Sequence, residues 1–252
     1  MHWTAPAAGL GAFAAALIAL APATLIDARL ERASGGRLRL AQAQGSLWSG
    51  AGWLEIRDAR GRAGVAQRLA WRVLPGSLLR ARLEAELELG QGARPFPLTL
   101  SLSRIEIAHA GIRLPAAALG LGMPSLAPLR LSGEMLLDVP RLSLERGRMQ
   151  GGATLRWRGA GSELAPIAPL GDYEVRFKAA GPAVHAALRT LEGPLQLEGK
   201  GTWSNSAPPS FVATARVPAR HREQLAPLLR LIAVERGAGS FELRSNGTAF
   251  GP

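Results

Sequence analysis

Cysteine is absent from this sequence of 252 residues, and its absence excludes several kinds of chemistry at once. Without thiols the chain cannot form a disulfide framework, a thiolate nucleophile, a zinc ribbon or an Fe–S cluster. Histidine is scarce too, with four residues scattered along the chain. We therefore expect neither a metal site nor a cofactor.

Lysine is nearly absent, although the chain is strongly basic. All but two of the 30 basic residues are arginine, the exceptions being Lys178 and Lys200, and the net charge is +11. Nucleic-acid binding would require clustered basic residues and aromatic side chains for stacking. The arginines are instead spread evenly, and there is a single tyrosine. We predict solvated strand faces and no nucleic-acid partner, while a positive surface can also contact anionic lipid headgroups.

Long helical patterns are missing from most of the chain, because 30 glycines and 18 prolines interrupt it. What is present is strict alternation of apolar and polar residues, which is typical of half-buried strands. We predict a mainly β fold, a curved antiparallel sheet of sequential hairpins. The residues expected on its buried face include Leu98, Leu100, Leu102, Leu155, Trp157 and Phe177.

Helices are expected at two places in this body. Residues 220–235 carry apolar side chains at helical spacing behind a polar start, and residues 115–122 follow a proline. Residues 83–89 alternate regularly but consist of the helix formers Leu, Ala and Glu. We interpret them as a strand, because Leu87 and Leu89 stay in phase with Leu83. No Ser/Gly linker divides residues 27–252, so we predict one β-rich body.

The N-terminus contains the longest uncharged run. The 24 residues from Trp3 to Ile26 carry no charged side chain, and as a helix they would extend about 36 Å, enough to cross a bilayer core of about 30 Å. We predict an uncleaved transmembrane anchor over residues 1–26. The alternative is a signal peptide cleaved after Ala19-Leu20-Ala21, which is weakened because Pro22 would follow the cut. Basic residues after the span favour a cytoplasmic body by the positive-inside rule.

Catalytic motifs are also lacking. No serine has glycine two residues before it, so there is no G-x-S-x-G elbow, and there is no H-E-x-x-H. Gly199-Lys200 lacks the earlier glycine that a phosphate-binding loop requires, because Pro194 stands there. We expect neither an enzyme nor a small-molecule substrate.

Several turn and packing motifs occur in a characteristic order. A span ending in Ala21-Pro22-Ala23 is followed by the turn at 45–50 (Gly-Ser-Leu-Trp-Ser-Gly), and then by Trp71-Arg72-Val73-Leu74-Pro75. Gly171-Asp172-Tyr173 and the run from Leu191 to Gly201 complete the series. In order, spacing and total length, the chain resembles the type II secretion system protein N (GspN) family of Gram-negative bacteria.

This resemblance implies a single-pass inner-membrane protein with its body in the periplasm, which outweighs the local charge count. The implied partners are the secretin and the inner-membrane platform of the secretion machine, and the family has no catalytic residues to transfer. The β-rich body is also similar to AsmA-like envelope proteins, in which an apolar groove handles lipid, and this is the alternative function. The residues singled out as structural or possible partner contacts are Gly45, Trp48, Gly50, Trp71, Gly171, Asp172, Tyr173, Gly193 and Gly199.

Overall fold

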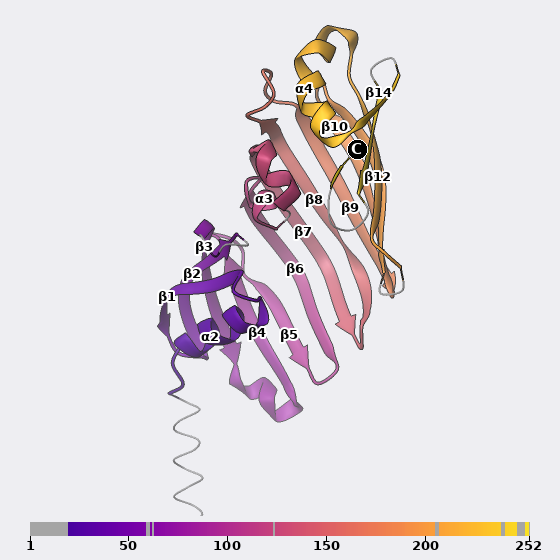
Figure 1. Ribbon diagram of the computed structural model, residues 1–252. Helices are drawn as coiled ribbons and strands as arrows, with labels where there is room; N and C mark the ends of the chain where they lie inside the picture. The colour runs from indigo at the N-terminus through magenta and orange to yellow at the C-terminus, as the bar shows by residue number, and fades with distance from the viewer. Residues whose placement is uncertain are drawn as a thin grey trace, which may run out of the picture.

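The protein is built on a single antiparallel sheet (Figure 1). The computed structural model describes residues 20–58, 61, 63–122, 124–204, 207–237, 240–245 and 250–251. Within them the sheet has 15 strands, and from β1 to β12 each strand pairs with its neighbours in sequence. The strands are β1 (Leu38–Gly45), β2 (Ser49–Arg57), β3 (Ala63–Leu74), β4 (Arg82–Leu89), β5 (Phe96–Ser101), β6 (Arg104–Pro115), β7 (Leu131–Glu145), β8 (Arg148–Ser162), β9 (Gly171–Gly181), β10 (Ala183–Glu192), β11 (Gln196–Ser204), β12 (Ser210–Arg216), β13 (Val234–Gly237), β14 (Ser240–Ser245) and β15 (Phe250–Gly251). The predicted sheet of sequential hairpins is confirmed.

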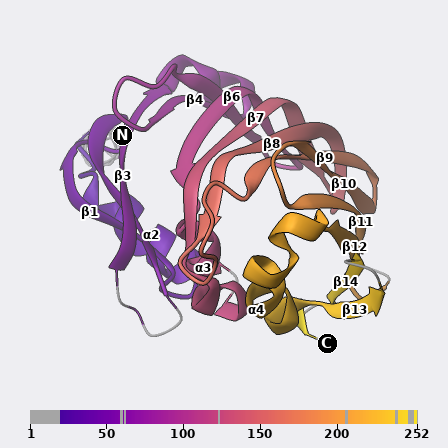
Figure 2. The same cartoon turned by 90° about the horizontal axis from the view of Figure 1, so that it is seen from above.

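Seen from above, the sheet curves into an arch, and the α-helices lie on its inner, concave side (Figure 2). The helical elements are α2 (Thr24–Ala33), α3 (Ala118–Gly122), α4 (Arg222–Ile232) and the 3₁₀ helices η1 (Pro75–Arg80), η2 (Pro124–Leu129) and η3 (Ala219–His221). Both predicted helices are present, as α3 and as η3 with α4. Helix α4 ends at Ile232 because Ala233 is extended and leads into β13.

The segment 83–89 is confirmed as a strand, because it pairs on both sides. Leu87 is opposite Trp71 of β3 and opposite Phe96 of β5. Two ladders of backbone hydrogen bonds therefore override the helix propensity of Leu, Ala and Glu.

The apolar core lies along the concave side in three clusters. Near the N-terminus, Ile26 and Leu30 of α2 pack around Trp71 and Leu40. A central cluster surrounds Phe96. The largest cluster is covered by α4, whose buried side chains meet β11, β12 and β14. The members contributed by α4 are Leu225, Leu228 and Leu229.

One residue of the predicted buried face is wrongly placed. Leu98 and Leu100 are half-buried, but Leu102 is 98% exposed. Strand β5 ends at Ser101, so Leu102 belongs to the turn before β6 and no longer follows the alternation.

Only the end of the predicted anchor can be compared with the structure, because residues 1–19 lie outside the described residues. Pro22 forms a β-bridge with Ser46, and Ala23 is buried against Leu40 and Trp71. Within the part of the chain that the structure describes, no helix is both long and apolar enough to cross a membrane. The span before residue 20 stays a prediction.

Candidate functional site

The most distinctive internal feature is an apolar cavity of about 260 Å³ on the concave side of the sheet. Strands β7 to β12 and β14 form its wall, and α3, η2 and α4 cover it. Aliphatic and aromatic side chains dominate its surface. The lining residues are Leu119, Leu126, Leu129, Leu131, Met135, Leu155, Trp157, Ala160, Ser162, Leu170, Tyr173, Val175, Leu188, Leu195, Leu197, Phe211, Leu228 and Leu243.

The few polar groups in this wall are already hydrogen-bonded within the protein. The Tyr173 hydroxyl donates to the carbonyl oxygen of Leu195 at 2.9 Å, and the Trp157 indole Nε1 donates to the carbonyl of Ser132 at 3.0 Å. The Ser162 hydroxyl donates to the carbonyl of Leu129 at 2.5 Å. Burial, with a smaller contribution from the charge of Asp172, raises the pKa of Tyr173 above its usual value. The cavity suits an apolar ligand, and its wall offers no acid–base group.

Half-buried apolar side chains continue the concave surface beyond this cavity. Ala153 lies two positions before Leu155, and its partner Phe177 lies two positions after Val175, so both share the face of the cavity-lining residues. The rings of Phe177 and Trp203 are 6.4 Å apart. The cavity is therefore the enclosed part of a longer apolar surface along the arch.

The predicted N-terminal residues come together in one cluster. Gly45 pairs with Gly50. A Cβ atom added at Gly50 would lie 2.5 Å from the Trp71 ring. The Trp71 indole donates to the Ser46 carbonyl at 3.2 Å, and the amide of Val73 donates to the carbonyl of Trp48. Trp71 is buried, whereas Trp48 is half-buried.

The predicted residues from Gly171 to Gly193 form a second cluster, at the ends of the strands opposite to the turn at 45–50. Gly193 has φ +125° and lies against Gly171, so a side chain at either position would meet backbone. Asp172 accepts a hydrogen bond from the amide of Gly159 at 2.8 Å, and Tyr173 reaches the cavity. Gly199 lies apart, on β11 against Ala213. The two clusters do not meet, and of the nine residues only Tyr173 lines the cavity.

A charged cluster on the convex face was not found by sequence reasoning. Glu174 lies on the strand face opposite Tyr173, and its side chain is 4% exposed. It pairs with Arg156 at 3.2 Å, Arg176 at 2.7 Å and Arg189 at 2.7 Å. Desolvation would raise the pKa of Glu174, but the hydrogen bonds from Arg156 and Arg189 and the charge of Arg176 outweigh it and lower the pKa. In the sequence, the alternation of apolar and polar residues places Arg156, Glu174 and Arg189 on polar strand positions. Only the register of the strands shows that they are neighbours.

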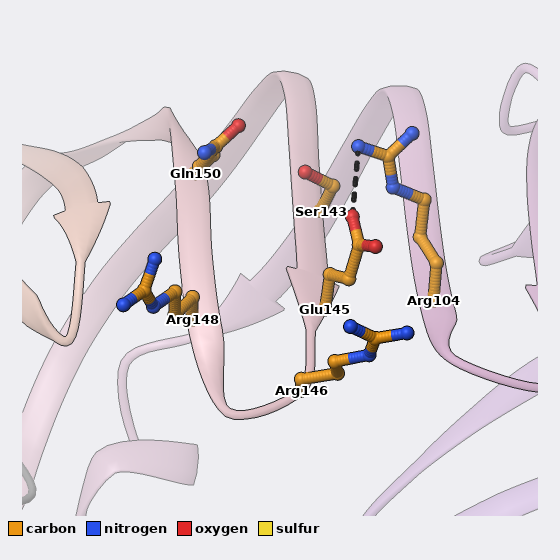
Figure 3. Close-up of a pocket in the computed structure, with 6 residues that line it drawn as sticks. All are labelled: Arg104, Ser143, Glu145, Arg146, Arg148 and Gln150. Carbon is orange, nitrogen blue, oxygen red and sulfur yellow. Dashed lines mark ion pairs between the residues drawn. The ribbon is translucent and has the colours of Figure 1, made fainter.

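A polar pocket of about 300 Å³ lies beside the turn between β7 and β8 (Figure 3). Arg104 forms an ion pair with Glu145 at 3.3 Å. Arg146 lies in the turn and Arg148 begins β8, and neither has an acidic partner among the described residues. Across the described part of the chain, no group of three His, Asp or Glu side chains is placed to hold a metal ion.

Comparison with known proteins gives one family. The family model described as type II secretion system (T2SS), protein N matches residues 36–244, which is more than four fifths of the chain. No curated protein and no solved structure matches the chain. The matched range begins just before β1 and ends within β14, so it covers nearly the whole sheet together with its cavity.

Proposed function

The chain belongs to the type II secretion system protein N family, and we propose that it is a non-enzymatic inner-membrane subunit of that system, with its body in the periplasm. The observation that carries this proposal is the extent of the family match, residues 36–244, which includes the arch and both clusters of glycine and aromatic residues. The proposed anchor is the part of the uncharged run that precedes Pro22, because Ala23 and Ile26 pack in the N-terminal cluster of the body.

The proposed partners are the secretin and the inner-membrane platform. We place the contact at β1, which ends the sheet and pairs with β2 alone. The amides of Leu38 and Leu40 already donate to the side chains of Ser34 and Asp27, so the contact falls on the exposed residues near Gln42. Gln42 and Gln44 on β1 are exposed, and Gln42 lies at an irregularity in the pairing between Ala41 and Gln44.

Photo-crosslinking in cells tests this function. A photo-reactive amino acid at Gln42 should crosslink to a secretin or platform component, and the matched control at Ala187, exposed in the middle of β10, should crosslink much less. If the products from both positions contain only proteins outside the secretion system, the proposal is wrong.

A second candidate function, lipid handling in the envelope, is favoured by one observation. The cavity holds no free polar group and continues into an apolar surface along the arch. Its volume of about 260 Å³ is slightly below the range of ligand pockets, which is of the order of 300–1,000 Å³. An acyl chain is the ligand that fits these properties.

Mass spectrometry of lipids bound to the purified full-length chain tests this candidate. Leu188→Trp fills the cavity and should reduce the bound acyl lipid at least fivefold. Val212→Trp is the matched control, because Val212 is exposed and its neighbour Phe211 lines the cavity. Equal lipid in all three proteins would mean that the cavity is structural.

A further inference from the structure

Every second connection between strands lies at the same end of the strands, because consecutive strands are antiparallel. We define the basal rim as the connections at 46–48, 75–81, 102–103, 146–147 and 182, at the lower end of the strands in Figure 1. Backbone contacts join its parts: the amide of Val73 donates to the carbonyl of Trp48, and that of Arg146 to the carbonyl of Ser103.

The N-terminal segment joins the body at this rim. The amide of Leu47 donates to the carbonyl of Ala21 at 2.8 Å, and that of Ala23 to the carbonyl of Gly45 at 3.3 Å. Pro22 forms a bridge with Ser46. The uncharged residues that begin at Trp3 and precede Ala21 therefore lead to the basal rim.

Exposed leucines are found on the same rim. Leu79 of η1 is 93% exposed, and Leu102, in the turn between β5 and β6, is 98% exposed. Leu20, which precedes the bridge at Pro22, is 80% exposed. A single exposed leucine carries little information, but here three such side chains lie along one edge.

Arginines are interspersed with these leucines. Arg80 stands at the end of η1 and Arg82 at the start of β4. Arg146 lies in the turn between β7 and β8, and Arg148 begins β8 (Figure 3). All four are exposed, and among the described residues none has an acidic partner. The acids beside Arg146 and Arg148 are already engaged, since Glu106 pairs with Arg141 and Glu145 with Arg104.

We propose that the basal rim lies on the surface of an anionic phospholipid bilayer. Leu79 and Leu102 enter the headgroup region, and the four arginines contact lipid phosphates. This inference rests on the proposed inner-membrane placement and adds a second contact to the anchor. Leucine side chains interspersed with arginines suit the mixed polarity of a headgroup layer, in which apolar side chains reach the acyl boundary while cations contact the phosphates.

The absence of cysteine makes a direct test possible. Ser103→Cys, next to Leu102 and exposed, places an environment-sensitive fluorophore on the rim of the full-length chain. Gln91→Cys is the matched control, because it lies in the exposed turn between β4 and β5 at the opposite edge. Both proteins are reconstituted into nanodiscs with or without phosphatidylglycerol, and quenching by brominated lipid and by aqueous iodide is measured.

In nanodiscs with phosphatidylglycerol, we expect lipid quenching at position 103 to exceed that at position 91 at least threefold. Leu79→Ser with Leu102→Ser, or Arg146→Glu with Arg148→Glu, should reduce it at least twofold. Equal access of iodide to both positions in proteins that enter the nanodiscs would overturn the rim proposal and leave the secretion function standing. Failure of the chain to enter nanodiscs at all would overturn the inner-membrane placement and the rim proposal together.

Discussion

At the scale of single residues, Trp71 is the side chain on which the N-terminal core depends most. It is 6% exposed, its ring fills the space left by Gly50, and its indole donates to the Ser46 carbonyl. Trp71→Ala should therefore lower the free energy of unfolding by about 3–5 kcal/mol. Trp53→Ala is the control, because Trp53 is 44% exposed and should cost far less. Urea unfolding followed by circular dichroism measures both, and equal losses would contradict this assignment.

Glu174 gives a prediction that depends on pH. Its folded-state pKa is lowered, so its stabilising contribution is complete above the unfolded pKa of about 4.3 and is lost as pH falls through the folded pKa. At pH 7, Glu174→Gln should destabilise the protein by about 1–3 kcal/mol, because three charged partners lose a carboxylate. The difference from wild type should shrink in acid.

The control for this prediction is Glu192→Gln, since Glu192 is exposed and near the end of β10. It should change stability little at any pH between 3 and 7, by analogy with surface charges that are worth about 0–1 kcal/mol. Chemical unfolding at several pH values measures both proteins. A Glu174→Gln difference that stays constant down to pH 3 would contradict the role of the carboxylate.

Residue-level prediction from the sequence succeeded where alternation alone decides the environment. Leu98 and Leu155 are half-buried on the concave face as expected, because each lies inside a strand. Leu102 failed because strand ends are set by turns, which alternation does not locate. Glu174 and its arginines could not be paired in advance, because the pairing depends on the register of β8, β9 and β10.

At the scale of elements, the strands differ in how firmly they are held. Strands β7 and β8 are 15 residues long and lie in the middle of the sheet, whereas β13 has four residues, all exposed, at the end of the strand order. We expect amides of β7 and β8 to exchange hydrogen most slowly and those of β13 much faster. Hydrogen exchange with mass spectrometry measures this order, and equal protection of β13 would contradict it.

The elements themselves were largely readable from the sequence. Alternation predicted the strands, and helical spacing of Leu225, Leu228 and Leu229 predicted α4. The alternative function expected an apolar groove, but the residues that line the cavity were not predicted. They come from many strands and from α3, η2 and α4, which only the curvature of the sheet brings together. Among the singled-out residues, Tyr173 alone belongs to the cavity.

At the scale of the whole molecule, topology is the first property to test. With the body in the periplasm, Gln91→Cys should react with a membrane-impermeant maleimide in spheroplasts, because Gln91 is exposed and the chain has no other cysteine. The arginines after the predicted span oppose this orientation. Reaction only after lysis of the inner membrane would place the body in the cytoplasm.

The central claim is that this chain is a working part of type II secretion, as its family indicates. Deleting its gene and measuring the distribution of an exported protein tests the claim most directly. We predict that the exported protein accumulates in the periplasm and that the wild-type gene restores its release. Normal release from the deletion strain, together with an altered lipid composition of the envelope, would contradict the claim and favour lipid handling instead.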